Sequence, residues 1–146
     1  MSLGSVLVPL PFEEMYAGRV FETAESFGYA AMDRFAALSG DYSGIHTEPE
    51  TAKRLGFRDR LQYGFLLASL LSRIVGTNFE HAVCAAVSMD FVKPAIAGEH
   101  VDVRAEVTQV QEAMRSVVLK ITMLSDHDVI ARGRLTTVFL TARLSM

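Results

Sequence analysis

Two kinds of hydrophobic periodicity divide the chain into a helical first half and a strand-rich second half. From Val101 to Val107, apolar and charged residues alternate strictly, which is typical of a β-strand with one face in water. Turn residues at 125–128 separate two further alternating runs at the distance of a hairpin. The pattern predicts strands at 83–92, 101–107, 117–123 and 130–140, and a fifth at 20–27.

Three segments of the first half have a helical pattern. A short helix is predicted over 30–38, and its inward residues are expected to be Met32, Phe35 and Ala36. A second helix is predicted to begin near Thr47, because residues 47–50 have the sequence of a capping box with proline in the first turn. The third, from about Gly64 to Val75, is apolar nearly all round, so we expect it to be buried.

These elements predict an α+β fold in which an antiparallel sheet wraps around one buried helix. Very small side chains recur every four residues along that helix, at Gly64, Ala68, Ser72 and Gly76. The spacing favours tight packing of this stripe on the sheet. The alternative is a ligand at the N-terminal end of the helix, where free N–H donors and the positive end of the dipole are available.

Length and charge limit the function classes. A chain of 146 residues is expected to form one domain. Half of the residues are hydrophobic and the mean hydropathy is +0.25, so part of the apolar surface is expected to lie in a subunit interface of a homo-oligomer. The net charge is −3 and the charges are dispersed, so nucleic acid is not expected as a partner.

The one cysteine, Cys84, excludes an internal disulfide and lies in an apolar run, where a buried structural thiol is expected. No paired ligand spacing predicts a metal site. The longest apolar stretch, Phe65–Leu71, is far shorter than the roughly 20 residues of a membrane-spanning helix, and no signal-peptide pattern opens the chain. A cytoplasmic protein that does not bind membranes is therefore expected.

Candidate chemistry is concentrated at residues 38–46, between the first two predicted helices. The segment contains the carboxylate of Asp41, the imidazole of His46, two small hydroxyls and two glycines. Residues five positions apart diverge on a regular helix, but they can converge in a loop bent by glycine. Such a carboxylate and imidazole are a candidate acid–base pair. The alternative, that Asp41 caps a turn and His46 is solvent-exposed, stays open on these residues alone.

The wider sequence resembles the MaoC-like, (R)-specific enoyl-CoA hydratases. Residues 35–46, followed by Ala52, are similar to that family's motif of aromatic, aliphatic, small, Gly, Asp, x, Asn, Pro, aliphatic and His, with Ala or Ser later. Three further segments, 11–21, 63–69 and 91–99, resemble the family's opening, its central-helix start and its Phe-x-x-Pro-x-x-x-Gly-Asp segment. The resemblance covers nearly the whole chain in the same order.

This resemblance implies a single MaoC-like hot-dog domain over residues 1–146. It also implies that Asp41 and His46 are the catalytic pair and activate one water. That water adds across the double bond of a trans-2-enoyl thioester to give the (R)-3-hydroxyacyl product, or is removed in the reverse reaction. No cofactor is implied, since the CoA or carrier-protein thioester is the substrate.

The resemblance also implies a set of substrate-binding residues. The backbone N–H of Gly64 is expected to bind the thioester oxygen as enolate charge develops. Tyr63 stands where the family has a histidine before that glycine. Ser72 stands where family members carry a serine near the site, although a helix serine that bonds back to its own backbone is an equal alternative.

The chain departs from the family motif at Ser43 and Gly44, which replace Asn and Pro. Serine is shorter and offers one donor instead of two, and glycine loosens the loop. Reduced activity, an unusual acyl group or a non-catalytic acyl-thioester binding subunit would each fit this change. A hot-dog thioesterase is the other alternative, but the spacing of Asp41 and His46 favours the hydratase.

Overall fold

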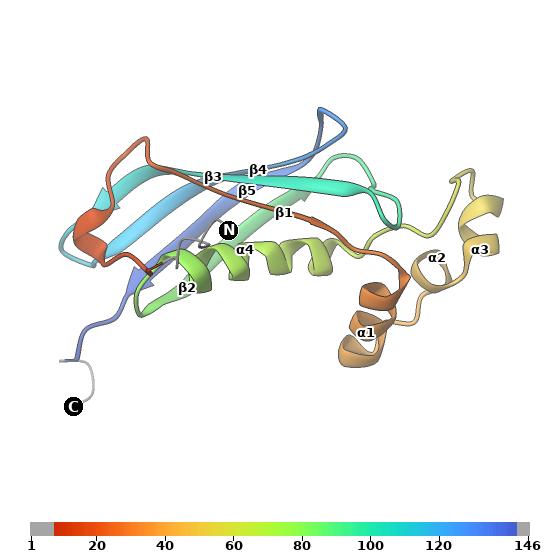
Figure 1. Ribbon diagram of the computed structural model, residues 1–146, viewed down its shortest axis with the longest axis horizontal. Helices are drawn as coiled ribbons and strands as arrows, with labels where there is room; N and C mark the ends of the chain where they lie inside the picture. Colours follow the sequence, from red (N-terminus) through yellow and green to blue (C-terminus); the bar gives the residue numbers. More distant parts are fainter. Residues whose placement is uncertain (1–7, 143–146) are drawn as a thin grey trace, which may run out of the picture.

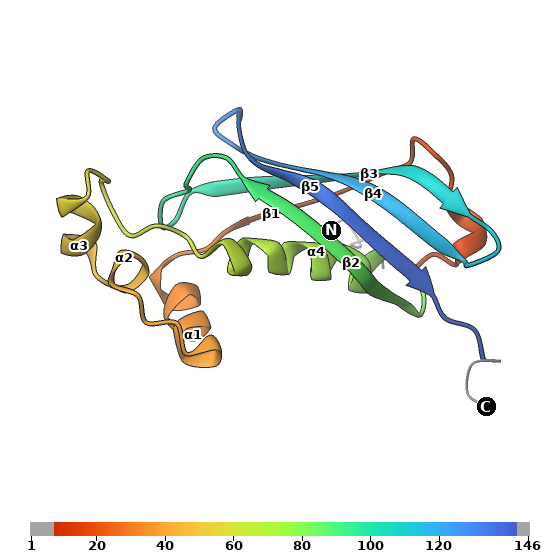
Figure 2. The same cartoon turned by 180° about the vertical axis from the view of Figure 1, so that it is seen from behind.

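The computed structural model describes residues 8–142 and contains one five-stranded antiparallel sheet in that range. The strand order is β1-β3-β4-β5-β2 (Figures 1 and 2). All five strands predicted from the alternating pattern are present: β1 (Val20–Ser26), β2 (Ala82–Phe91), β3 (His100–Gln111), β4 (Ser116–Ser125) and β5 (Asp128–Phe139).

Helices occupy one face and one end of this sheet. The long helix α4 (Gly64–Asn78) runs along the sheet face, whereas three shorter helices lie beyond one end of the sheet (Figure 1). These are α1 (Tyr29–Ser39), α2 (Gly44–Thr47) and α3 (Pro49–Arg54), and a 3-10 turn, η1 (Phe12–Glu14), precedes β1. A sheet curved around one helix confirms the expected α+β class.

The core lies between α4 and the inner face of the sheet. Alternate residues of β3 and β4 point inward and are almost completely buried, including Val103, Ala105, Leu119 and Ile121. Removing such side chains from water is the main stabilising term, about 25 cal/mol per Å² of apolar surface.

Only one face of α4 is buried, which corrects the expectation of a helix buried all round. Its buried residues are Leu66, Leu67, Leu70, Leu71, Ile74 and Val75. On the opposite face, the side chain of Phe65 is 83% exposed. None of the helices within residues 8–142 is long and apolar enough to cross a bilayer.

Strand β2 is an edge strand with an unusually apolar and exposed surface. Val83, Val87 and Phe91 are 44–55% exposed. Cys84 is also exposed, so the prediction of a buried thiol is wrong for the isolated chain. The physical reason is that, within the described residues, β2 pairs only with β5, and α4 does not cover this part of the sheet's inner face.

The predicted capping box at Thr47 is also wrong. Thr47 is the last residue of α2, and its hydroxyl donates to the carbonyl oxygen of Ser43 at 3.0 Å. Glu48 is the N-cap of α3, and Pro49 follows in the first turn as expected. The sequence pattern placed a loop before Thr47 and did not predict the helical turn α2 that precedes α3.

Gly133 allows β2 and β5 to approach closely. A Cβ atom at this position would lie 1.9 Å from the carbonyl oxygen of Ser88 and 2.5 Å from the sulfur of Met89. The first contact is with backbone, which cannot rotate away, so any side chain here would push β2 outward.

We therefore expect Gly133→Ala to lower the free energy of unfolding by about 1–3 kcal/mol, the usual cost of overpacking. Urea unfolding followed by circular dichroism measures this change. Gly76→Ala is the matched control, because no atom lies within 4 Å of a Cβ there and the position is helical. It should stabilise the protein by about 0.5–1 kcal/mol. Equal stability of Gly133→Ala and wild type would contradict the close approach.

Candidate active site

The segment that carries Asp41 and His46 begins where α1 ends. Gly40 has a left-handed φ of 79° and its N–H donates to the carbonyl of Ala36 at 2.8 Å, which closes the helix and turns the chain. The segment was expected to be a loop throughout, but residues 44–47 form the helical turn α2. His46 therefore lies on a short helix and Asp41 in the turn before it.

Asp41 is held as a carboxylate by Ser43. The hydroxyl and the backbone N–H of Ser43 both donate to Oδ1 of Asp41, the latter at 3.0 Å. These two hydrogen bonds lower the pKa of Asp41, and the nearby His46 adds a smaller electrostatic contribution. Within residues 8–142 no hydrogen bond occupies Oδ2, so this oxygen can accept one from a ligand.

The backbone determines the tautomer of His46. Its Nδ1 lies 2.8 Å from the carbonyl oxygen of Leu61. A carbonyl can only accept, so Nδ1 carries the hydrogen, and in the neutral ring Nε2 has a free lone pair. Leu61 also donates its N–H to the carbonyl of Ile45 at 3.0 Å. The imidazole is thus presented as a base in a fixed orientation. No hydrogen bond or ion pair joins it directly to Asp41 in the described chain.

Tyr63 contacts both Asp41 and His46. Its ring stacks on His46 with centroids 4.2 Å apart, and its hydroxyl donates to the carbonyl oxygen of Asp41 at 2.7 Å. Tyr63 is only 2% exposed, and burial raises the pKa of its phenol. Its side chain therefore contacts both Asp41 and His46, and the contact with substrate that the resemblance implies for Tyr63 stays a prediction.

Arg60 is a site residue that the sequence analysis missed. Its side chain is 4% exposed, its Nε donates to the carbonyl oxygen of His46 at 2.5 Å, and its Nη2 forms an ion pair with Asp33 at 2.7 Å. The local sequence gives no signal for this role, because Arg58 and Arg60 look alike in sequence. The burial of Arg60 follows only from the tertiary fold.

The N-terminus of α4 presents unused donors beside this pair. The backbone N–H groups of Gly64, Phe65 and Leu66 have no intramolecular acceptor among the described residues, and Tyr63, the N-cap, makes no side-chain cap. A Cβ on Gly64 would lie 3.2 Å from the ring of Phe91. The absence of a side chain at Gly64 thus allows the Phe91 ring to lie close to this helix end.

A groove of about 380 Å³ runs between α4 and β2. Ala68, Ser72 and Gly76 line one wall, and Val87 and Cys84 line the other. The expectation that the small-residue stripe packs tightly on the sheet is therefore wrong beyond Gly64. Ser72 is exposed in this groove and makes no hydrogen bond back to its own helix within residues 8–142.

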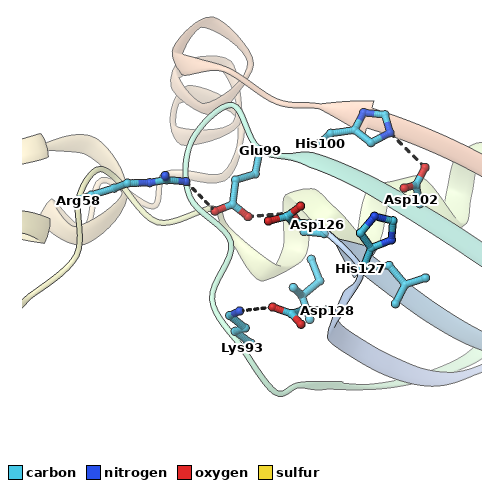
Figure 3. Close-up of a pocket in the computed structure, with 11 residues that line it drawn as sticks. Arg58, Lys93, Glu99, His100, Asp102, Asp126, His127 and Asp128 are labelled. Atoms are coloured by element: carbon cyan, nitrogen blue, oxygen red, sulfur yellow. Dashed lines mark hydrogen bonds and ion pairs between the residues drawn. The ribbon is translucent and has the colours of Figure 1, made fainter.

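A larger hollow of about 580 Å³ lies elsewhere, at the turn between β4 and β5 (Figure 3). Its charges are largely neutralised within the chain. Lys93 pairs with Asp128 at 2.7 Å, and Arg58 pairs with Glu99 at 3.2 Å. The pairing raises the pKa of Lys93 and lowers that of Asp128. Neither Asp41 nor His46 lines this hollow.

No three His, Cys, Asp or Glu side chains within residues 8–142 are close enough together to bind one metal ion.

Comparison with known proteins identifies the family. A family model described as "MaoC like domain" matches residues 16–128, which is most of the chain. The chain therefore belongs to the MaoC-like domain family.

Two curated relatives illustrate the match. The (R)-specific enoyl-CoA hydratase of Aeromonas caviae is 30% identical over 102 residues, which cover 68% of this chain and 76% of that protein. A mitochondrial 3-hydroxyacyl-[acyl-carrier-protein] dehydratase of Arabidopsis thaliana is 27% identical over 103 residues. That alignment covers 70% of this chain but only 62% of the plant protein.

The fold agrees with a solved relative. The structure of the (R)-hydratase from A. caviae superposes with a TM-score of 0.84 at 25% identity, covering 88% of this chain and 99% of that one. The hot-dog fold implied by the sequence resemblance is thus confirmed.

The role of Ser43 gives a direct test of the Asp41 environment. Because the Ser43 hydroxyl stabilises the ionised carboxylate, Ser43→Ala should raise the pKa of Asp41 toward its ordinary value. A pH titration of the Asp41 carboxyl carbon by NMR measures this. Ser43→Asn is the matched variant: its amide can donate in place of the hydroxyl, so the pKa should stay low. An unchanged pKa in Ser43→Ala would refute the assignment.

Proposed function

We propose that this chain is a hydro-lyase that hydrates trans-2-enoyl thioesters to (R)-3-hydroxyacyl thioesters, or catalyses the reverse dehydration. The observation that supports this most strongly is that the Tyr63 side chain contacts both Asp41, whose pKa is lowered, and His46, whose Nε2 lone pair is free. Both lie in a member of the MaoC-like family whose curated relatives are named hydratases and dehydratases.

In the proposed reaction, one water binds between Oδ2 of Asp41 and Nε2 of His46. As the water oxygen adds to C3 of the enoyl group, Nε2 takes one of its protons, and Asp41 accepts a hydrogen bond from the other and stabilises the imidazolium. The C2=C3 electron pair moves toward the thioester carbonyl. The imidazolium then returns the proton to C2, so the net change is addition of one water.

The N-terminus of α4 would stabilise the developing enolate. We propose that the thioester oxygen accepts a hydrogen bond from the N–H of Gly64, where the positive end of the helix dipole adds to the effect. Donors that are already in place need no reorganisation during the reaction. The lack of a side chain at Gly64 would let the oxygen approach this amide.

The groove along α4 would hold the acyl chain. Its small wall residues, including Ala68 and Ser72, leave room for a chain that starts at Gly64, and its volume is within the range of small-ligand sites. Both a CoA thioester and a carrier-protein thioester fit this proposal.

Besides hydration, two other activities fit a hot-dog protein: hydrolysis of the thioester, and binding of the thioester without catalysis. Incubation with crotonyl-CoA separates the three. Loss of the enoyl absorbance without release of CoA thiol indicates hydration, and thiol release indicates a thioesterase. If crotonyl-CoA binds saturably but neither signal appears, the protein is a non-catalytic binding subunit.

We expect Asp41→Asn and His46→Ala each to lower the rate of crotonyl-CoA hydration by about 10²–10⁴, the typical contribution of a general acid–base group. Both side chains are only partly buried, so the variants should fold, which circular dichroism checks. If both variants were folded and fully active, the catalytic assignment would fail.

We also propose that the protein is a homodimer or a dimer of dimers, with β2 in the contact. A second copy could pair with the free edge of β2 and cover the exposed Val83, Val87 and Phe65. Light scattering at micromolar concentration should give a multiple of the 16.0 kDa chain mass. Phe65→Asp, at the most exposed of these three side chains, should weaken the assembly. A monomeric wild type would count against the proposal.

A further inference from the structure

Arg60 is buried beside His46 although nothing in the reaction proposed above needs a cation there. Its side chain is only 4% exposed, whereas that of Arg58, two residues earlier, is 75% exposed. A buried guanidinium must have its charge and its donors satisfied, so its partners indicate what it holds in place.

The partners of Arg60 lie on two different helices. Nε donates to the carbonyl oxygen of His46 on α2 at 2.5 Å. Nη2 pairs with Asp33 on α1 at 2.7 Å, and Cζ of the guanidinium lies over the ring of Tyr29 on the same helix, 4.4 Å from its centroid. One side chain thus ties the short helix that carries His46 to α1.

Neighbouring contacts hold Arg60 itself rigidly. Its N–H donates to Oδ1 of Asp59 at 2.7 Å, and the hydroxyl of Tyr29 donates to the same oxygen at 2.5 Å. Its carbonyl accepts the N–H of Ala97 at 2.8 Å. The backbone at Arg60 is therefore anchored before its side chain reaches His46.

From this geometry we infer that Arg60 is a positioning residue: its guanidinium fixes the peptide of His46 and so keeps Nε2 aimed at the reacting water. The inference rests on the function proposed for His46. The four-residue helix α2 cannot hold its own direction, because isolated helices this short are unstable. The His46 carbonyl is at its C-terminal end, where it lacks an intrahelical donor and attracts a positive charge.

Arginine suits this position better than lysine. Its planar fork donates from Nε and Nη2 in different directions while its face stacks on an aromatic ring. An ammonium could satisfy one of these contacts at a time. The kcat of Arg60→Lys should therefore lie between that of wild type and that of a variant without a charge at this position.

Steady-state kinetics with crotonyl-CoA test the inference. In Arg60→Met we expect kcat to fall about 10- to 100-fold, as for a misplaced catalytic group, with KM changed less than about twofold. Arg58→Ala is the matched control and should keep wild-type kcat, since the Arg58 side chain is exposed and pairs with Glu99, away from His46. Added ethylguanidinium should restore part of the kcat of Arg60→Ala, but none of that of His46→Ala.

A purely structural role predicts different results. It would lower the folded fraction, measured by thermal unfolding, without a rescue by ethylguanidinium. The inference is overturned by a folded Arg60→Met with normal kcat, by a loss confined to KM, or by a loss of kcat that only follows unfolding.

NMR of ¹⁵N-labelled histidine separates this inference from the proposed function. In wild type, the His46 signals, assigned with His46→Ala, should report one Nδ1–H tautomer. In folded Arg60→Met they should report averaging between tautomers. If wild type had no hydratase activity but showed this change, the proposed function would fail and the positioning by Arg60 would stand. An unchanged tautomer and line width in Arg60→Met would overturn the positioning whatever the activity.

Discussion

The backbone of residues 60–62 is hydrogen-bonded along both edges, and the geometry of the candidate site depends on it. On one edge, Leu61 receives Nδ1–H from His46 and donates to Ile45. On the other, Leu61 bridges to Ile96, and Gln62 donates to Ala95 at 2.9 Å. A short extended segment thus connects the turn that carries the imidazole to the loop that follows β2, immediately before α4 begins. Displacement of this segment would move the imidazole and the helix N-terminus together.

A second constraint is that the two faces of α4 have different roles. Its apolar face anchors it in the core through residues such as Leu70 and Ile74, each about 1% exposed. Its other face consists of small residues that leave a groove, and its first amides have no acceptor. The same helix therefore provides stability with one face and donors and space with the other. A rigid core element is a suitable base for a site that must be held to within a fraction of an ångström.

The sequence predicted the elements whose information is local, and it missed features that depend on contacts across the fold. The patterns of apolar residues and turns predicted all five strands, and the motif around Asp41 and His46 located the candidate pair. Arg60 could not be found, because its burial follows from the docking of α1 and α2 and not from its neighbours in sequence. Cys84 was misplaced for a similar reason: an apolar run predicts a buried strand, but not that the strand lies at the edge of the sheet. The role of Tyr63 as a link between Asp41 and His46 likewise became visible only in three dimensions.

The exposed edge of β2 has a thermodynamic consequence. Along this strand, one row of backbone N–H and C=O groups faces away from β5 and is unpaired within the described chain. If a second copy covers this edge, association draws the folding equilibrium toward the native state by mass action. The temperature at which half of the molecules are unfolded would then rise with protein concentration. Dilution would destabilise β2, which forms one wall of the groove, before it destabilised the core under α4.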